Sequence, residues 1–592
     1  MKKFLISFLG AMSAIWLSMF LGIFLVVIFF AVAVASASKS SDAVKVRANS
    51  YLELDLSGAF ADRTSELDYM ALLQGQLNKE QVVGRTAEAI RRAASDDNIE
   101  GIYIKCGGSA AGIAQRQTLV EALRRFKQEA PSKWIYAYAD DYTQGDYYVA
   151  ASVADSLFLN PVGGASINGL VATTPFFKGF LDKVGVEMQV VKVGTYKSAV
   201  EPFILTNMSE ASREQQQLFL GNIWGTIAAS IAEGRKVSAD TVNSWADSYL
   251  FGASAEALVE RKVVDALCYG HEMNERLASL TGRKSASKLR AVGTSDYLRS
   301  LPEEKTSKGA VKLGVYYACG DITDSEGNGI VGTTVVADIL ELAEDNDIDG
   351  LMLFVNSGGG SAFASEQIWE SLQYWKKTTG KPLYVYMSDY AASGGYYISS
   401  GADKIYAQPT TLTGSIGIFG LIPNAKGLIT DKLGITFGTV KTNNASEVSI
   451  AQPLSAADRA ALQATVDRGY DLFTRRCAEG RHMSQDSIKR IAEGRVWDGS
   501  EALKIGLVDE LGNLDDALRG LAASLNAESW SVVEYPREAD KWKKLLRELS
   551  DELETRYMRS RLGDMAPLYE EAARLRSLSG VQALAPVTDV TL

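Results

Sequence analysis

Histidine is scarce in this chain of 592 residues, which contains only His271 and His482. A catalytic triad or metal centre that depends on histidine therefore has few candidates. Both histidines lie in polar stretches, "CYGHEM" and "EGRHMS", which are typical of exposed helix or loop positions, so we expect neither to be catalytic. If the chain is a hydrolase, its general base is expected to be another type of residue.

Cysteine is also sparse, and its spacing excludes two further classes of site. The four cysteines show no CxxC spacing and no nearby histidine pair, which argues against a zinc site or a redox motif and favours small buried hydrophobic residues. The sequence also lacks a GxxxxGK[ST] phosphate loop and, in its glycine-rich stretch, a GxGxxG motif. We therefore predict no metal and no cofactor. The cysteines are Cys106, Cys268, Cys319 and Cys477.

Positive charge is in deficit, because the formal net charge is −11. No basic cluster is interleaved with aromatic residues, so a nucleic-acid partner is not expected. With 46% hydrophobic and 22% charged residues, the composition is that of a folded globular protein. A chain of this length is too long for one hydrophobic core, so we expect two similar domains and an anchor.

The N-terminal segment has no charged residue between Lys3 and Lys39. Its apolar run is long enough to cross a hydrocarbon core of about 30 Å, which predicts a transmembrane anchor within residues 1–40. Lys2 and Lys3 precede the run, so the positive-inside tendency leaves the N-terminus in the cytoplasm and the bulk of the chain on the periplasmic or extracellular side. The alternative is a signal peptide cleaved near "VASASKSS", although a signal-peptide core is usually shorter.

The soluble part of the chain contains an internal repeat with an offset of about 249 residues. "GIYIK" matches "GLMLF", "IYAYADDY" matches "LYVYMSDY", and "LDKVGV" matches "TDKLGI". Short apolar runs such as "PLYVYM" alternate with helical patterns such as "SEQIWESLQYWKKTTG", in which apolar residues recur at helical spacing. Strands this apolar imply a sheet covered by helices, so each repeat is predicted to be an α/β unit.

The two repeats differ at the residues that could carry chemistry. Ser393 of the second repeat lies in a turn of small residues, and Gln144 stands opposite it in the first repeat. Conversely, Lys197 of the first repeat has Ser446 opposite it in the second. Two half-sites pooled into one would produce this pattern, and chance divergence is the alternative.

A serine and a lysine can together form a nucleophile and its base without histidine. Lys197 could act as the base only when neutral, so its pKa must be lowered by burial or by nearby cations, and it should lie in a desolvated cleft. Ser415, in "LTGSIGIFG", could orient the amine through a hydrogen bond. The alternative for Ser415 is an ordinary turn serine.

Acyl transfer also needs N–H donors for the developing oxyanion. The stretch "FVNSGGGSA" follows a predicted strand, and its glycines let the backbone approach a substrate carbonyl closely. We expect Gly359 to supply one N–H, and Gly394, directly after Ser393, to supply the other. Read alone, "SGGGS" could equally be a flexible turn.

At these residues the sequence resembles the long, double-domain form of bacterial signal peptide peptidase A, of peptidase family S49. "VNSGGGS" resembles the oxyanion segment of that family, "AASGGYYIS" its nucleophile motif, and "GTYKSAVEPF" its lysine motif, in the order of the family. One departure is Gly358, which stands where the family commonly has proline, so the rigidity of this segment is in question.

The resemblance implies a Clp-protease/crotonase-like α/β superhelix in each repeat and a Ser-Lys dyad assembled from both. It also implies a homotetrameric ring in the cytoplasmic membrane that degrades cleaved signal peptides and other apolar peptides. The domains would be an anchor (1–40), an N-terminal repeat (45–300), a C-terminal repeat (308–535) and a charged helical tail of unassigned role (536–592). A crotonase-like acyl-CoA enzyme and a non-catalytic membrane scaffold are the alternative functions.

Overall fold

The computed structural model describes most of the chain between Lys45 and Arg537, and short pieces at both ends. The predicted membrane anchor falls almost entirely outside the described residues, as does the predicted helical tail after Lys541. Among the described residues, no helix combines the length and apolar character that a membrane span requires. The described ranges are 45–63, 81–302, 310–327, 329–345, 347–443, 449–537, 580–585 and 590–591, with Gly10, Trp16 and Leu21.

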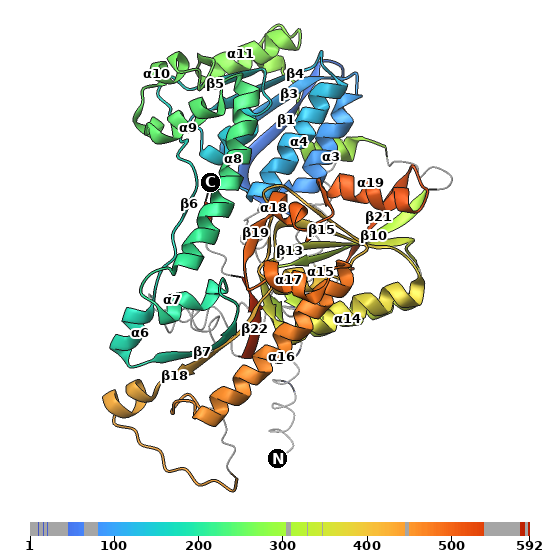
Figure 1. The fold of residues 1–592 in the computed structure, drawn as a ribbon. Helices are drawn as coiled ribbons and strands as arrows, with labels where there is room; N and C mark the ends of the chain where they lie inside the picture. The colour runs from blue at the N-terminus through green and yellow to red at the C-terminus, as the bar shows by residue number, and fades with distance from the viewer. Residues whose placement is uncertain are drawn as a thin grey trace.

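The N-terminal repeat is built on a parallel seven-stranded sheet of order β2-β1-β3-β4-β5-β8, with β9 paired to β1. Helices pack on the sheet in the upper part of Figure 1. The strands are β1 (Ser50–Ala61), β2 (Gln81–Val82), β3 (Ile99–Ala110), β4 (Trp134–Ala139), β5 (Ser156–Leu159), β8 (Ala266–Leu267) and β9 (Ala291–Gly293). The helices are α3 (Val83–Ala94), α4 (Ile113–Glu129), α5 (Gln144–Ala151), α8 (Glu210–Arg235), α9 (Ala239–Asp247), α10 (Ala255–Glu260), α11 (Gly270–Leu280) and α12 (Thr294–Ser300).

The C-terminal repeat has an eight-stranded sheet of order β19-β17-β15-β13-β10-β21, in which β16 pairs with β15 and β20. Its pairings are parallel except for β17 with β19. The strands are β10 (Val311–Cys319), β13 (Gly350–Ser357), β15 (Leu383–Ala392), β16 (Lys404–Ala407), β17 (Leu412–Gly414), β19 (Val496–Asp498), β20 (Glu510–Leu511) and β21 (Trp530–Tyr535). The helices are α13 (Gly332–Asp345), α14 (Ala362–Thr379), α15 (Gly394–Ser399), α16 (Ala456–Gly480), α17 (Gln485–Ile491), α18 (Gly499–Lys504) and α19 (Leu514–Ser524).

Burial explains why these segments form a helix-covered sheet. Seven of the eight residues of β13 are buried, as expected for a strand with helices on both faces. On α14, the predicted apolar residues Ile368, Leu372 and Trp375 are fully buried. Ser361 caps the start of this helix by accepting a hydrogen bond from Ala364 N, and Gly380 ends it in the left-handed conformation. The predicted α/β class is confirmed.

A third sheet joins the two repeats. Its order is β12-β11-β14-β22-β18-β7, and β7 is the strand that the N-terminal repeat supplies. Figure 1 shows β7, α6 (Lys178–Val184) and α7 (Glu201–Ile204) beside β18 and α16, well below the first sheet. In this way the N-terminal repeat extends an arm along the C-terminal repeat. The strands are β7 (Glu187–Val193), β11 (Ile322–Thr323), β12 (Ile330–Val331), β14 (Gly359–Ser361), β18 (Ile418–Asn424) and β22 (Gly580–Leu584).

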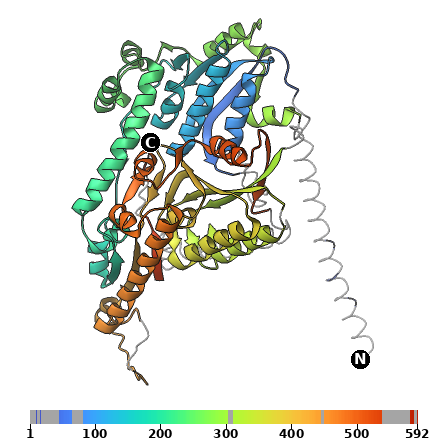
Figure 2. The same cartoon turned by 45° about the vertical axis from the view of Figure 1, so that its right-hand side comes forward.

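The far C-terminal residues also return to the N-terminal repeat. β23 (Val590–Thr591) pairs antiparallel with β6 (Val171–Ala172). Figure 2 shows the blue and green elements of the N-terminal repeat above the yellow and orange elements of the C-terminal repeat. Of the two short C-terminal strands, β22 therefore pairs with the C-terminal repeat and β23 with the N-terminal repeat.

Candidate active site

Ser393 lies in the tight turn between β15 and α15. Its φ angle is +55° and its ψ angle is −112°, a sparsely populated conformation that costs a non-glycine residue about 1–3 kcal/mol. Hydrogen bonds hold this turn on both sides: Ser393 N donates to Gly414 O over 2.8 Å, and Tyr397 N donates to Ser393 O over 2.8 Å. The surrounding structure therefore fixes the direction of the Ser393 side chain.

Lys197 comes from the arm of the N-terminal repeat, four residues after the end of β7. The C-terminal repeat packs against its backbone: Tyr196 N donates to Glu493 O over 2.9 Å, and a Cβ added to Gly494 would lie 2.6 Å from Lys197 Cβ. From α8, Gln215 Nε2 donates to Tyr196 O over 3.0 Å. These contacts fix the lysine, and no motif in the sequence marks Gly494 or Gln215 for this role.

The structure brings together the three polar side chains that the sequence predicts to cooperate. Lys197 Nζ lies 2.7 Å from Ser393 Oγ, 3.1 Å from Ser415 Oγ and 3.0 Å from the Ser415 carbonyl oxygen. All three residues are fully buried. The contact between Lys197 and Ser393 joins residues from different repeats, as the predicted pooling of half-sites requires.

Burial lowers the pKa of Lys197 well below its usual value, because desolvation disfavours the ammonium form. A neutral amine has one lone pair and two N–H donors. The geometry fits this form: the Ser393 hydroxyl can donate to the lone pair, while the two N–H groups can donate to the hydroxyl and carbonyl oxygens of Ser415. In this position a neutral Lys197 amine could accept the hydroxyl proton of Ser393.

The two predicted oxyanion donors lie close together beside Ser393. A Cβ built on Gly359 would lie 2.7 Å from Gly394 N, and the Gly359 φ angle of +104° also requires glycine. The Gly359 N–H donates to Ser357 Oγ over 3.1 Å. The same hypothetical Cβ would lie 2.1 Å from the carbonyl oxygen of Ala583, and one built on Gly394 would lie 3.1 Å from it. A peptide carbonyl therefore sits next to both glycines.

The matching position of the N-terminal repeat has a structural role. Gln144, opposite Ser393 in the repeat, is buried, and its Nε2 donates to Gly169 O over 2.8 Å. Its Oε1 accepts from Asn168 N over 2.6 Å and from Gly169 N over 2.9 Å. Gln144 thus fixes the backbone of the loop at residues 168–169 through these hydrogen bonds. Ser446, the counterpart of Lys197, lies outside the described residues.

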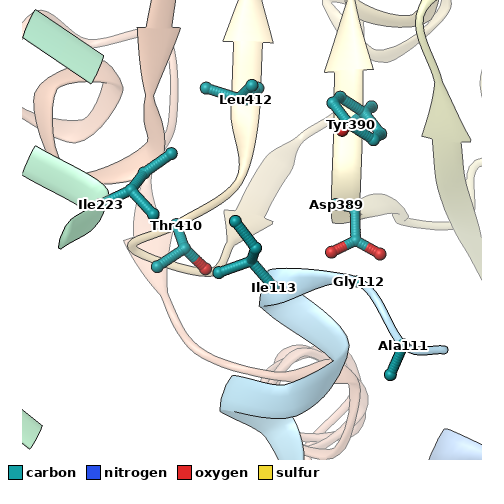
Figure 3. A pocket seen from close by; sticks show the side chains of 8 residues that line it. All are labelled: Ala111, Gly112, Ile113, Ile223, Asp389, Tyr390, Thr410 and Leu412. Carbon is teal, nitrogen blue, oxygen red and sulfur yellow. The ribbon is translucent and has the colours of Figure 1, made fainter. Parts of the chain in front are cut away.

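A second buried polar site lies where the repeats meet, around Asp389, four residues before Ser393 in the chain. Asp389 accepts a hydrogen bond from Ala114 N at the start of α4 over 2.8 Å. Burial, followed by the charge of Asp62, raises the pKa of Asp389 to about 7. A cavity of about 90 Å³ opens beside it, and Figure 3 shows the carboxylate facing the start of α4. The cavity is lined by Ala111, Gly112, Ile113, Ile223, Asp389, Tyr390, Thr410 and Leu412.

The histidines and cysteines occupy the kinds of position expected for them. His271 and His482 are both exposed. The cysteines are free thiols, and three of them are buried, while Cys319 is half-buried.

Comparisons with known proteins connect this geometry to a family. The sequence matches the family model described as Peptidase family S49 over residues 127–284 and 376–528, and the Clp protease model over residues 323–413. Protease 4 from Haemophilus influenzae is 33% identical over 530 residues, which cover 87% of this chain and 85% of that protein. Protease 4 from Salmonella typhi is 33% identical over 505 residues, with coverages of 82% and 80%. A chloroplastic serine protease SPPA from Arabidopsis thaliana is 26% identical over 486 residues, with coverages of 80% and 69%.

Proposed function

Because this chain belongs to peptidase family S49 and is a serine protease, we propose that Ser393 is its nucleophile and Lys197 its general base. The observation that carries the proposal is the 2.7 Å contact between Lys197 Nζ and Ser393 Oγ in a fully buried cleft. Membership of the family favours a peptidase over the acyl-CoA enzyme and the scaffold. Ser415 would be a positioning residue that orients the amine.

In the proposed reaction, neutral Lys197 takes the hydroxyl proton as Ser393 Oγ attacks the carbonyl carbon of a peptide bond. The resulting ammonium gives this proton to the leaving amine when the C–N bond breaks, which leaves an acyl-serine ester. Water then attacks the ester, with Lys197 accepting its proton and returning it to Ser393 Oγ. One water is consumed, and a carboxylate and an amine are released.

The N–H groups of Gly359 and Gly394 would stabilise the oxyanion of each tetrahedral intermediate. Donors of this kind are each worth about 2.7–4 kcal/mol. Support comes from the Ala583 carbonyl oxygen, which lies against both glycines. Since the Gly359 N–H also reaches Ser357 Oγ, that hydroxyl would have to yield this donor to the oxyanion.

The substrates would be apolar peptides, including signal peptides left after cleavage, and the site of action would be the cytoplasmic membrane. In this proposal residues 1–40 anchor the chain, residues 45–300 and 308–535 form two extracytoplasmic domains that share one catalytic site, and 536–592 form a tail. A homotetramer is proposed because the arm and the C-terminal repeat both expose large apolar side chains. Phe180, Leu433 and Phe437 are 61%, 62% and 52% exposed.

Hydrolysis of an apolar fluorogenic peptide by the membrane-extracted full-length chain tests the dyad. We expect Ser393→Ala and Lys197→Met each to lower kcat by at least about 10²–10⁴-fold, the usual range for a positioned base. Lys284→Met changes an exposed lysine of the N-terminal repeat and should leave kcat unchanged. Wild-type turnover in the Lys197→Met variant would refute the assignment of the base.

A further inference from the structure

The C-terminal segment Gly580–Ala585 fills a gap one strand wide next to Ser393. Its strand, β22, stands between β14 and β18 in the third sheet and runs antiparallel to both. Gly360 of β14 is opposite Ala583, and Phe419 of β18 is opposite Gln582. Beyond the strand, Ala585 N donates to Gly358 O over 2.8 Å. The segment therefore uses backbone groups of both neighbouring strands.

Both neighbouring strands belong to the catalytic site. β14 carries Gly359, one of the proposed oxyanion donors, and β18 begins three residues after Ser415. The Ala583 carbonyl oxygen lies beside Gly359 and Gly394, the two residues whose N–H groups would bind the carbonyl of a scissile bond. The backbone of β22 thus occupies the place that the proposed reaction assigns to a peptide substrate.

The side chains of the segment fit this place closely. Ala583 is fully buried and Ala585 is 5% exposed, so larger side chains at these two positions would collide with the surrounding residues. Leu584 packs with an apolar cluster that contains Phe419 and Leu421 of β18 and Val200 of the arm. The site accordingly receives a small residue at the carbonyl beside Ser393 and an aliphatic residue after it.

We infer that β22 is a built-in competitor: the C-terminal segment of this chain binds as a substrate-like strand and must leave before an apolar peptide can bind. The inference rests on the proposed dyad of Ser393 and Lys197. Peptides bind to open strand edges through main-chain hydrogen bonds, and only one strand can fill the gap between β14 and β18. A tethered segment competes at an effective concentration on the order of millimolar, so it can outcompete dilute substrates.

Two truncated chains separate the effect of β22 from that of the rest of the tail. One ends at Ser579 and lacks β22, while its control ends at Pro586, keeps β22 and lacks β23. If the segment blocks the site about nine-tenths of the time, the apparent KM for a fluorogenic apolar peptide is raised about tenfold. We therefore expect the chain ending at Ser579 to show a KM about tenfold lower than that of the control, with the same kcat.

Two further measurements test whether β22 competes with substrate, and one of them uses the full-length chain in case the shorter chain folds poorly. In the full-length chain, Ala583→Pro removes a backbone N–H from β22 and should lower KM in the same way. A synthetic peptide of residues 580–586 should raise the KM of the chain ending at Ser579. Equal KM values in both truncated chains and in Ala583→Pro would overturn the inference. Failure of the dyad would differ, since then no chain would hydrolyse peptide or be acylated at Ser393 by a fluorophosphonate.

Discussion

Replacing Ser415 with alanine tests how the amine of Lys197 is held. The Ser415 hydroxyl lies 3.1 Å from Lys197 Nζ and the Ser415 carbonyl oxygen lies 3.0 Å from it, in a fully buried site. Alanine keeps the carbonyl but removes the hydroxyl, so one N–H of the amine loses its acceptor. An unsatisfied buried donor costs about 1–3 kcal/mol, which corresponds to about 5- to 150-fold in rate.

We expect this loss in kcat rather than in KM, because Ser415 contacts the base. The rising limb of kcat/KM against pH should also move to lower pH. The hydroxyl oxygen accepts a hydrogen bond that favours the ammonium, so its removal lowers the pKa of Lys197 further. Steady-state hydrolysis of a fluorogenic apolar peptide between about pH 5 and pH 10 measures both effects.

The variant Ser415→Gly is the matched control for backbone strain. Ser415 has a φ angle of +50°, which glycine adopts more easily than alanine, while both variants lack the hydroxyl. Equal losses in the two variants would assign the effect to the hydroxyl. Recovery of kcat in Ser415→Gly, or a wild-type kcat and pH profile in Ser415→Ala, would show that the Ser415 hydroxyl does not hold the amine.

Three further changes have defined outcomes. Gly359→Ala should lower kcat by about 10²–10³-fold, since its Cβ would lie 2.7 Å from Gly394 N. Gly380→Ala is the control, because it lies in open space at a helix end and should lower stability without changing kcat. The raised pKa of Asp389 means that the carboxyl stabilises the fold only while protonated, so the wild type should lose up to about 1.4 kcal/mol of stability per pH unit as pH rises from about 4 to 7. Asp389→Asn should abolish this pH dependence. Urea unfolding across the same pH range measures the effect. Arg116→Met breaks a buried 3.1 Å ion pair with Asp146 and should cost about 3–5 kcal/mol of unfolding free energy. An unchanged urea midpoint would show that this ion pair does not stabilise the fold.

The candidate site could be predicted from the sequence because the two repeats can be aligned, and they differ at the positions that could carry chemistry. Comparison of the repeats singles out Ser393 against Gln144 and Lys197 against Ser446, and the scarcity of histidine favours lysine as the base. The apolar runs also predict the central strands, since residues buried on both faces of a sheet leave an unmistakable local pattern.

The contacts that assemble the site could not be predicted in the same way. β7 pairs with β18 in a register set by tertiary packing, and the two strands are more than 200 residues apart in the chain. The five residues of β22 show too little local pattern to predict a strand, and their partners are equally remote. Gly494 is an isolated glycine that is needed because the Lys197 backbone packs against it. This contact is made in the folded chain, and the local sequence does not encode it.

The role of Lys197 can be tested directly by the pH dependence of Ser393 acylation by an uncharged serine-reactive probe, compared between the wild type and Lys197→Met. We expect the wild-type rate to rise with pH as Lys197 loses its proton, with a midpoint well below the usual lysine pKa because the amine is buried. In Lys197→Met this rise should disappear and the rate should fall by about 10²–10⁴-fold. The same rate and the same pH profile in both proteins would contradict the claim that Lys197 activates Ser393.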